Sequence, residues 1–207
     1  MQFAGIGIAV TVGSRSTERA AETVAALAGR WAERDLPLLA GDNAQAASAD
    51  VVVVATPWDA VLTSVEPLAA ALEGKLVVSM ANALTRWDGH MVPLLPPTGS
   101  VTVAVAQALS GARVAGAFHH LPAGTWADLD HPLEADVLVC SATRATTDEM
   151  IELIDRLPGL RGVDAGGLGS ALAIEALTPA LLEVNRRYRT HASIRLTGLD
   201  ARTRRDP

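Results

Sequence analysis

Short apolar runs recur along the chain and alternate with stretches whose apolar residues follow helical spacing. Residues 50–55 (DVVVVA) and 75–80 (KLVVSM) are apolar at successive positions, which is typical of strands buried on both faces of a parallel sheet. Further strands are expected at residues 6–12, 113–118, 136–140 and 161–164, with a possible short one at 38–40. Helices are expected at residues 16–34, 43–48, 59–72, 100–109, 147–157 and 168–189, with possible breaks at Pro67 and Pro179, whereas 81–97 is expected to be a loop.

Strands that alternate with helices predict βαβ units, and therefore an α/β fold with a doubly wound, mostly parallel sheet. In such folds ligands bind beside the loops that follow the carboxyl ends of the strands. In this chain those loops are residues 13–15 (GSR), 56–58 (TPW), 80–84 (MANAL) and 119–123 (HHLPA). A composition shift near 112–120, followed by a long C-terminal helix, predicts a second, smaller C-terminal lobe, and the polar residues 200–207 are expected to be a disordered tail.

The stretch TVGSRSTER, residues 11–19, joins the first expected strand to the first long helix. Arg19 lies one helical turn beyond Arg15, so both guanidinium groups can face one point beside the hydroxyl of Ser14. Arginine forms forked hydrogen bonds to phosphate oxygens, and a helix N-terminus favours an anion, so the stretch suits a phosphate dianion. The alternative is an ordinary strand–turn–helix junction with Ser16 as N-cap and two solvated arginines.

Composition narrows the classes of function. The chain has 207 residues and a net charge of −6, which argues against broad nucleic-acid binding. No apolar run is long enough for a membrane span. The first residues lack the basic segment of a signal peptide and are only weakly apolar, so no signal peptide is expected. The single cysteine, Cys140, ends a buried-looking strand, so an inert core thiol in a reducing cytoplasm is expected.

Five motifs in register resemble one family, the F420-dependent NADP reductases. These are VGSR at 12–15, TPW at 56–58, VVS at 77–79, HHLPA at 119–123, and the pair VDAG at 163–166 and EALTPALL at 175–182. The resemblance implies hydride transfer between NADP(H) and the deazaflavin coenzyme F420 by a homodimer. It also implies a Rossmann-type NADP-binding domain at residues 1–118 and a smaller C-terminal domain at 119–199.

The resemblance also implies which residues contact the cofactors. Carried over by position, those holding the 2′-phosphate of NADP are Ser14, Arg15 and Arg19, and those packing along the cofactor are Trp58 and Leu62. Near the nicotinamide end we expect Met80, Ala81, Asn82, Leu84 and Ala123, and on the deazaflavin side His119, His120 and Pro122. Adjacent histidines point apart and lack a third ligand at metal spacing, so no metal site is expected.

The chain departs from the family pattern at its start. The family begins with a strand and a glycine-rich turn that receives the pyrophosphate, whereas residues 5–7 are only Gly-Ile-Gly, and Gly5 is interpreted as the C-terminal break of a helix. We therefore expect a Rossmann sheet without that strand, owing to a misassigned start codon or a truncated gene. The alternative functions are an NADP-dependent reductase with another acceptor, such as an imine or a flavin, and a truncated, non-catalytic remnant.

Overall fold

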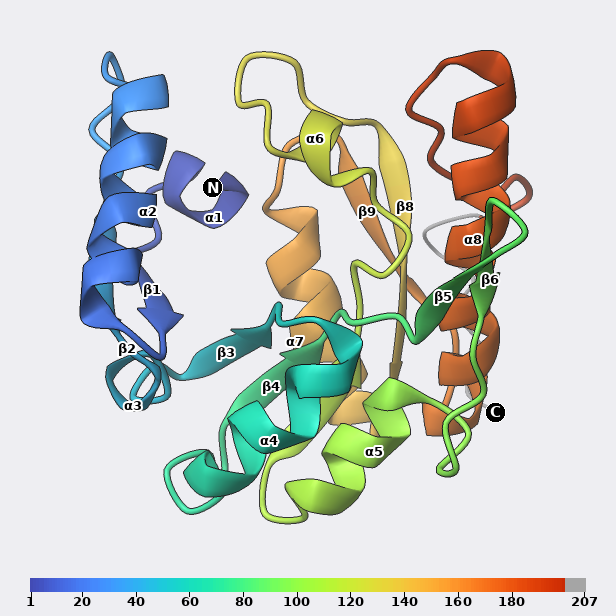
Figure 1. Cartoon of the computed structure of the whole chain (residues 1–207), viewed down its shortest axis with the longest axis horizontal. Coiled ribbons are helices and arrows are strands. Elements are labelled where there is room, and N and C mark those ends of the chain that lie inside the picture. Colours follow the sequence, from blue (N-terminus) through green and yellow to red (C-terminus); the bar gives the residue numbers. More distant parts are fainter. Residues whose placement is uncertain (200–207) are drawn as a thin grey trace.

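The computed structural model describes residues 1–199. The expected disordered tail, residues 200–207, lies outside the described residues. Figure 1 shows a central sheet with helices on both faces and a smaller two-stranded unit beside it. The expectation of an α/β fold with a mostly parallel sheet is confirmed.

The central sheet has five strands in the order β3-β4-β7-β8-β9. Their bounds are β3 Val51–Val54, β4 Leu76–Ser79, β7 Arg113–Gly116, β8 Ala135–Ser141 and β9 Leu160–Asp164. Neighbouring strands are parallel except β7 and β8, which are antiparallel. Because β3, β4 and β7 run the same way, the loops that follow them share one edge of the sheet.

Both faces of this sheet are covered, as the continuous apolar runs predict. On one face, side chains such as Leu76 and Val78 pack against helix α7 (Arg144–Asp155). On the other face, Val77 packs with residues of α4 (Val61–Val65) and α5 (Val101–Ala108). Every residue of β4 is buried, so β4 is the strand around which both core layers assemble.

A separate parallel pair consists of β1 (Val10–Ser14) and β2 (Leu38–Asp42). Between them runs α2 (Thr17–Arg30), and the short α3 (Asn43–Ala46) follows β2 and packs against β1. Within residues 1–199 no strand pairs with the outer edge of β1 or of β3, so the sheet is split between them. The expectation of a strand beginning at residue 6 is wrong, because the chain starts with α1 (Gln2–Gly5) and turns at Gly7 (φ +81°) before β1.

Helix α1 is fastened to the loop region after β7. The Gln2 side chain donates hydrogen bonds to the carbonyls of Trp126 (2.6 Å) and Asp128 (2.9 Å), which lie in and just after α6 (Ala123–Trp126). Phe3 meets Phe118 edge-on, with ring centroids 6.1 Å apart, and Phe118 stacks on Trp126 at 4.9 Å. These contacts cover part of the main core where the sheet is split.

The expected loop at 81–97 is instead the hairpin of β5 (Leu84–Trp87) and β6 (His90–Pro93). Its two turn residues, Asp88 and Gly89, have φ of 46° and 76°, which a two-residue hairpin turn of type I′ requires. The Asp-Gly pair was the available signal, and the charged residues around it obscured the strand pattern. The hairpin lies beside the last helix, α8 (Ala171–Tyr188), at the right of Figure 1.

Two prolines have different effects. Near Pro67 the expected helix is broken into η1 (Trp58–Ala60), α4 and η2 (Glu66–Leu68). By contrast, α8 continues through Pro179 after the short η3 (Leu168–Ser170). Pro179 is buried, and tertiary packing of α8 therefore overrides the loss of one intrahelical hydrogen bond. In residues 1–199 we find no helix with the length and apolarity that crossing a bilayer requires.

The division into two domains at residue 118 stays a prediction. Strands β8 and β9 follow residue 118 but belong to the same sheet as β7. The part of the chain after residue 118 therefore contributes both to the central sheet and, through α8, to the layer beside the hairpin.

Two glycine substitutions test how β1 is held. A Cβ on Gly13 would lie 2.6 Å from the Cβ of Ala46 in α3, so Gly13→Ala must displace α3 and should lower the free energy of unfolding by about 1–3 kcal/mol. Gly29, near the end of α2, has open space around it, so Gly29→Ala should raise that free energy by about 0.5–1 kcal/mol. Urea unfolding measures both, and equal effects of the two substitutions would contradict the packing of α3 on β1.

Candidate functional site

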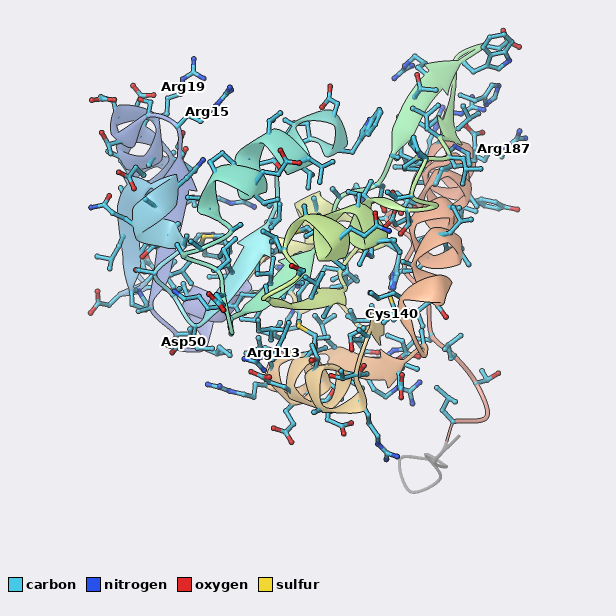
Figure 2. The ribbon with its side chains drawn as sticks, turned by 90° about the horizontal axis from the view of Figure 1, so that it is seen from below. Arg15, Arg19, Asp50, Arg113, Cys140 and Arg187 are labelled. Carbon is cyan, nitrogen blue, oxygen red and sulfur yellow. The ribbon has the colours of Figure 1, made fainter. Side chains whose placement is uncertain are left out.

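The β1–α2 junction presents two arginines on one side of the molecule. Ser16 is the N-cap of α2 and accepts a hydrogen bond from the backbone N–H of Arg19 (3.3 Å), while its own hydroxyl donates to Glu18 (2.6 Å). The side chains of Arg15 and Arg19 are exposed and, in Figure 2, project from the same corner of the molecule. Within residues 1–199 neither arginine has an acidic partner, so both charges are available to an anion.

Ser14 ends β1 beside these arginines. Its hydroxyl accepts a hydrogen bond from the backbone N–H of Ser16 (3.3 Å), and Ser14 is paired in register with Asp42 at the end of β2. The junction thus contains the N-cap that an ordinary strand–turn–helix connection requires. It also brings together the three side chains that the sequence predicts as a phosphate site.

The loops after β3, β4 and β7 converge at the other part of the predicted site. Trp58 donates a hydrogen bond from Nε1 to the carbonyl of Leu84 (3.1 Å), which joins the first loop to the second. Asn82 donates from Nδ2 to the carbonyl of His119 (2.9 Å), which joins the second loop to the third. Trp58 and Leu62 are each 37% exposed, so an apolar surface beside these loops remains accessible.

His119 and His120 are both buried and point to different elements. The Nε2 atom of His119 lies 3.4 Å from the hydroxyl of Thr102 in α5, whereas Nε2 of His120 accepts a hydrogen bond from the backbone N–H of Leu138 in β8 (3.3 Å). Burial is the main cause that lowers the pKa of each histidine to about 4. For His119 the neighbouring His120 lowers the pKa further. Both rings are therefore neutral at physiological pH.

The remaining predicted contacts lie around these histidines. The carbonyls of Met80 and Ala81, just after β4, face His119 and act to raise its pKa against the stronger effect of burial. Pro122 is the N-cap residue of α6, and Ala123, its first residue, is exposed. The structure therefore places all the predicted nicotinamide-end and deazaflavin-side residues in the two segments that follow β4 and β7, at one edge of the sheet.

Buried polar atoms without partners gather at the same edge. In residues 1–199, seven side-chain polar atoms are buried without a hydrogen-bond partner, and five of them lie in or next to these loops. The five atoms are Thr56 Oγ1, Ser79 Oγ, Asn82 Oδ1, His119 Nδ1 and His120 Nδ1. Each such atom costs about 1–3 kcal/mol if nothing bonds it, so their concentration fits a polar ligand group with several donors and acceptors. A nicotinamide or a deazaflavin ring, which is flat, partly apolar and edged with carbonyl and N–H groups, has these properties.

Three residues around His119 are absent from the sequence-based prediction, namely Thr102, Glu175 and Thr178. Thr178 donates a hydrogen bond from Oγ1 to the carbonyl of His119 (2.9 Å), and Glu175 accepts three hydrogen bonds from the start of α5. The available signal was an acidic residue at a position of α8 where helical spacing requires an apolar one, between Ile174 and Pro179.

Two other kinds of chemistry, a cysteine nucleophile and a metal site, can be compared with the structure. Cys140 is fully buried, and burial raises the pKa of its thiol to about 11, so it stays protonated and cannot act as a nucleophile. Among the residues that the structure describes, no three His, Cys, Asp or Glu side chains come together as a metal site would need. The arrangement can bind and orient flat ligands.

The buried histidines make stability depend on pH. In the unfolded chain each histidine has a pKa near 6.5, and in the folded chain about 4, so the unfolded state binds more protons in this interval. The free energy of unfolding should therefore fall as pH is lowered from about 6.5 to about 4, by up to ~3 kcal/mol per histidine.

Substitution separates this contribution from that of other groups. Urea unfolding across this pH interval should show a reduced slope for His119→Asn and for His120→Asn, and an unchanged slope for His191→Asn, because His191 is exposed. Identical slopes in all three variants would contradict the neutral, buried state of the two rings.

Solved structures share this fold. A putative F420-dependent NADP reductase from Arthrobacter sp. FB24 superposes with a TM-score of 0.75 over 92% of this chain and 90% of that chain, at 24% sequence identity. An imine reductase from Bacillus cereus superposes with a TM-score of 0.59 over 91% of this chain and 57% of that chain, at 17% identity. At these identities the likeness concerns the fold alone.

Sequence comparison gives the family. Residues 2–83 match the family described as NADP oxidoreductase coenzyme F420-dependent. The F420-dependent NADP reductase of Methanocaldococcus jannaschii is 33% identical over 92% of this chain and 88% of its own length. That of Methanothermobacter marburgensis is 29% identical over 96% of this chain and 92% of its own length. With this degree of identity over nearly the whole length, the chain belongs to the family of F420-dependent NADP reductases.

Proposed function

We propose that this chain transfers a hydride between NADP(H) and coenzyme F420. The relatives that this chain matches over nearly their full length are named for that activity. The observation in the structure that carries the proposal is the group of buried, unpartnered polar atoms at the carboxyl ends of β3, β4 and β7. When bound, the two cofactors supply the redox chemistry, and the protein supplies binding, orientation and exclusion of water.

At the NADP end, we propose that Ser14, Arg15 and Arg19 hold the 2′-phosphate. Two arginines that have no acidic partner among residues 1–199, next to the N-terminus of α2, favour a dianion over the free hydroxyl of NAD. The half-exposed side chains of Trp58 and Leu62 then cover the cofactor along its length. Trp58 is fixed in place by its hydrogen bond to Leu84.

At the hydride-transfer end, we propose that the nicotinamide lies beside the backbone of Met80 and Ala81, with Asn82, Leu84 and Ala123 around it. On the deazaflavin side we place His119, His120 and Pro122. Because both histidines are neutral, they can accept or donate a hydrogen bond to a ring edge without adding a charge. Burial of these groups keeps water from the reacting atoms.

A homodimer is part of the proposal. Large apolar side chains are exposed on the β5–β6 hairpin, on the segment after it and on α8, including Trp87 (73%), Leu95 (71%) and Tyr188 (76%). Strand β6 packs against α8, and the hairpin and α8 lie together at the end of the molecule where Arg187 is labelled in Figure 2. Exposed apolar surface of this kind is typical of an interface between subunits. A cytoplasmic location without nucleic-acid partners accords with a net charge of −6 and one buried, unpaired cysteine.

The assignment of the 2′-phosphate site has a direct test. Arg15→Ala and Arg19→Ala should each weaken NADPH binding about tenfold or more and leave NADH binding within about twofold, since a hydrogen bond to a charged group contributes about 1.5–3 kcal/mol. Titration calorimetry with both nucleotides measures this. Arg30→Ala, at the far end of α2, is the matched control because Arg30 stacks on Trp31 and should not affect either nucleotide. Equal losses of NADPH and NADH affinity would contradict the assignment, and no binding by the unsubstituted chain would contradict the proposed function.

The proposed subunit interface is tested by charge insertion. Trp87→Asp should convert a dimer to a monomer in sedimentation analysis, because an unpaired carboxylate would replace a ring that the proposed interface buries. Leu39→Asp is the control, since Leu39 is 59% exposed on β2, away from the hairpin. A monomeric unsubstituted chain, or a dimer that withstands Trp87→Asp, would argue against this interface.

A further inference from the structure

A buried carboxylate on α8, that of Glu175, bonds the backbone at the start of α5. Glu175 is 4% exposed, and its Oε2 accepts a hydrogen bond from the backbone N–H of Val101 (2.9 Å). Its Oε1 accepts hydrogen bonds from the backbone N–H and from the hydroxyl of Thr102, both at 2.9 Å. One side chain thus bonds two of the four N–H groups that the start of a helix leaves without intrahelical partners.

This carboxylate is more than a helix cap. Ser100 already caps α5, because its hydroxyl accepts a hydrogen bond from the N–H of Val103 (3.0 Å). Burial raises the pKa of Glu175, which shows that the site is costly for a charge, and the hydrogen bonds from Thr102 and Val101 oppose that rise. A cap alone could be made at lower cost by a neutral side chain or by water.

The hydroxyl of Thr102 connects Glu175 to His119. Its single proton goes to Glu175, so its oxygen can only accept from the Nε2 atom of His119, 3.4 Å away. Gly116 leaves room for this contact, because a Cβ there would lie 3.1 Å from His119 Nε2 and 3.1 Å from Thr102 Cγ2. The backbone of His119 is held separately, since Thr178, three residues after Glu175 in α8, bonds its carbonyl.

We propose that Glu175 is a positioning residue for His119, acting through the Thr102 hydroxyl to keep the ring proton on Nε2. The unpartnered Nδ1 is then an acceptor at the edge of the sheet where the proposed site lies. The importance of this arrangement for hydride transfer rests on the proposed function. The arrangement of Glu175, Thr102 and His119 itself does not, because it exists in the protein without cofactors.

The first test is made on the ligand-free protein. Nitrogen-15 NMR of the imidazole rings distinguishes the two neutral forms of a histidine, and His119→Asn assigns the signals. The expected result is His119 with its proton on Nε2 in the unsubstituted chain and in Thr102→Ser, which keeps the hydroxyl. In Thr102→Val and Glu175→Gln, the His119 signals should shift toward the other neutral form or a mixture of the two.

Matched variants separate positioning from general damage. Glu183→Gln is the control on the same helix, because Glu183 pairs with His90 and Arg186 at the surface and does not contact α5. It should leave the His119 signals unchanged. If His119 carries its proton on Nδ1 in the unsubstituted chain, or if folded Thr102→Val and Glu175→Gln retain unchanged His119 signals, the inference is overturned.

The second test uses steady-state kinetics with NADPH and F420. Glu175→Gln and Thr102→Val should lower kcat by about tenfold and change the KM for NADPH less than about twofold, with Thr102→Ser restoring most of kcat. A KM effect without a kcat effect would contradict a positioning role for His119. Absence of any turnover by the unsubstituted chain would contradict the proposed function instead, and the NMR result would still decide whether Glu175 positions His119.

Discussion

The parallel alignment of β3, β4 and β7 is the constraint on which the rest of the molecule depends. Since all three strands run the same way, in register from Val51 opposite Leu76 to Leu76 opposite Arg113, their following loops emerge at one edge. That alignment brings Trp58, Asn82 and His119 together from positions far apart in the chain. The apolar layers on both faces fix the strands, and thereby the loops, in this arrangement.

The same edge is where the molecule accepts unfavourable interactions. A buried carboxylate, two buried neutral histidines and several unbonded polar atoms lie beside a core that is otherwise apolar. Such groups lower stability unless a ligand or a neighbouring side chain bonds them, so they are expected where binding takes place. Helix α8 provides part of this bonding from the C-terminal part of the chain, which links the hairpin side of the molecule to the strand ends.

The fold followed from the sequence where the signal is local. The runs at residues 51–55 and 76–78 are apolar at every position because both faces of these strands pack in the core, and the structure has β3 and β4 there. The hairpin was missed, although Asp88-Gly89 marks its turn, because β5 is mostly exposed and lacks the alternating apolar pattern. Candidate ligand contacts could be named because the loops after the strands carry motifs that resemble the family. The bond between Glu175 and Thr102 joins residues 73 positions apart and leaves no local pattern. Residue-level cofactor contacts and the domain division remain predictions.

The proposed phosphate site and the proposed hydride-transfer site lie on the two sides of the split between β1 and β3. Hydride transfer by this chain is therefore the claim that most needs a direct test. The most direct measurement is isotope transfer. The chain is mixed with F420 and NADPH that carries deuterium at C4 of the nicotinamide, and reduced F420 is examined by mass spectrometry. The account predicts deuterium in reduced F420 only when this chain is present. Formation of no reduced F420, or of reduced F420 whose added hydrogen comes only from water, would contradict direct hydride transfer.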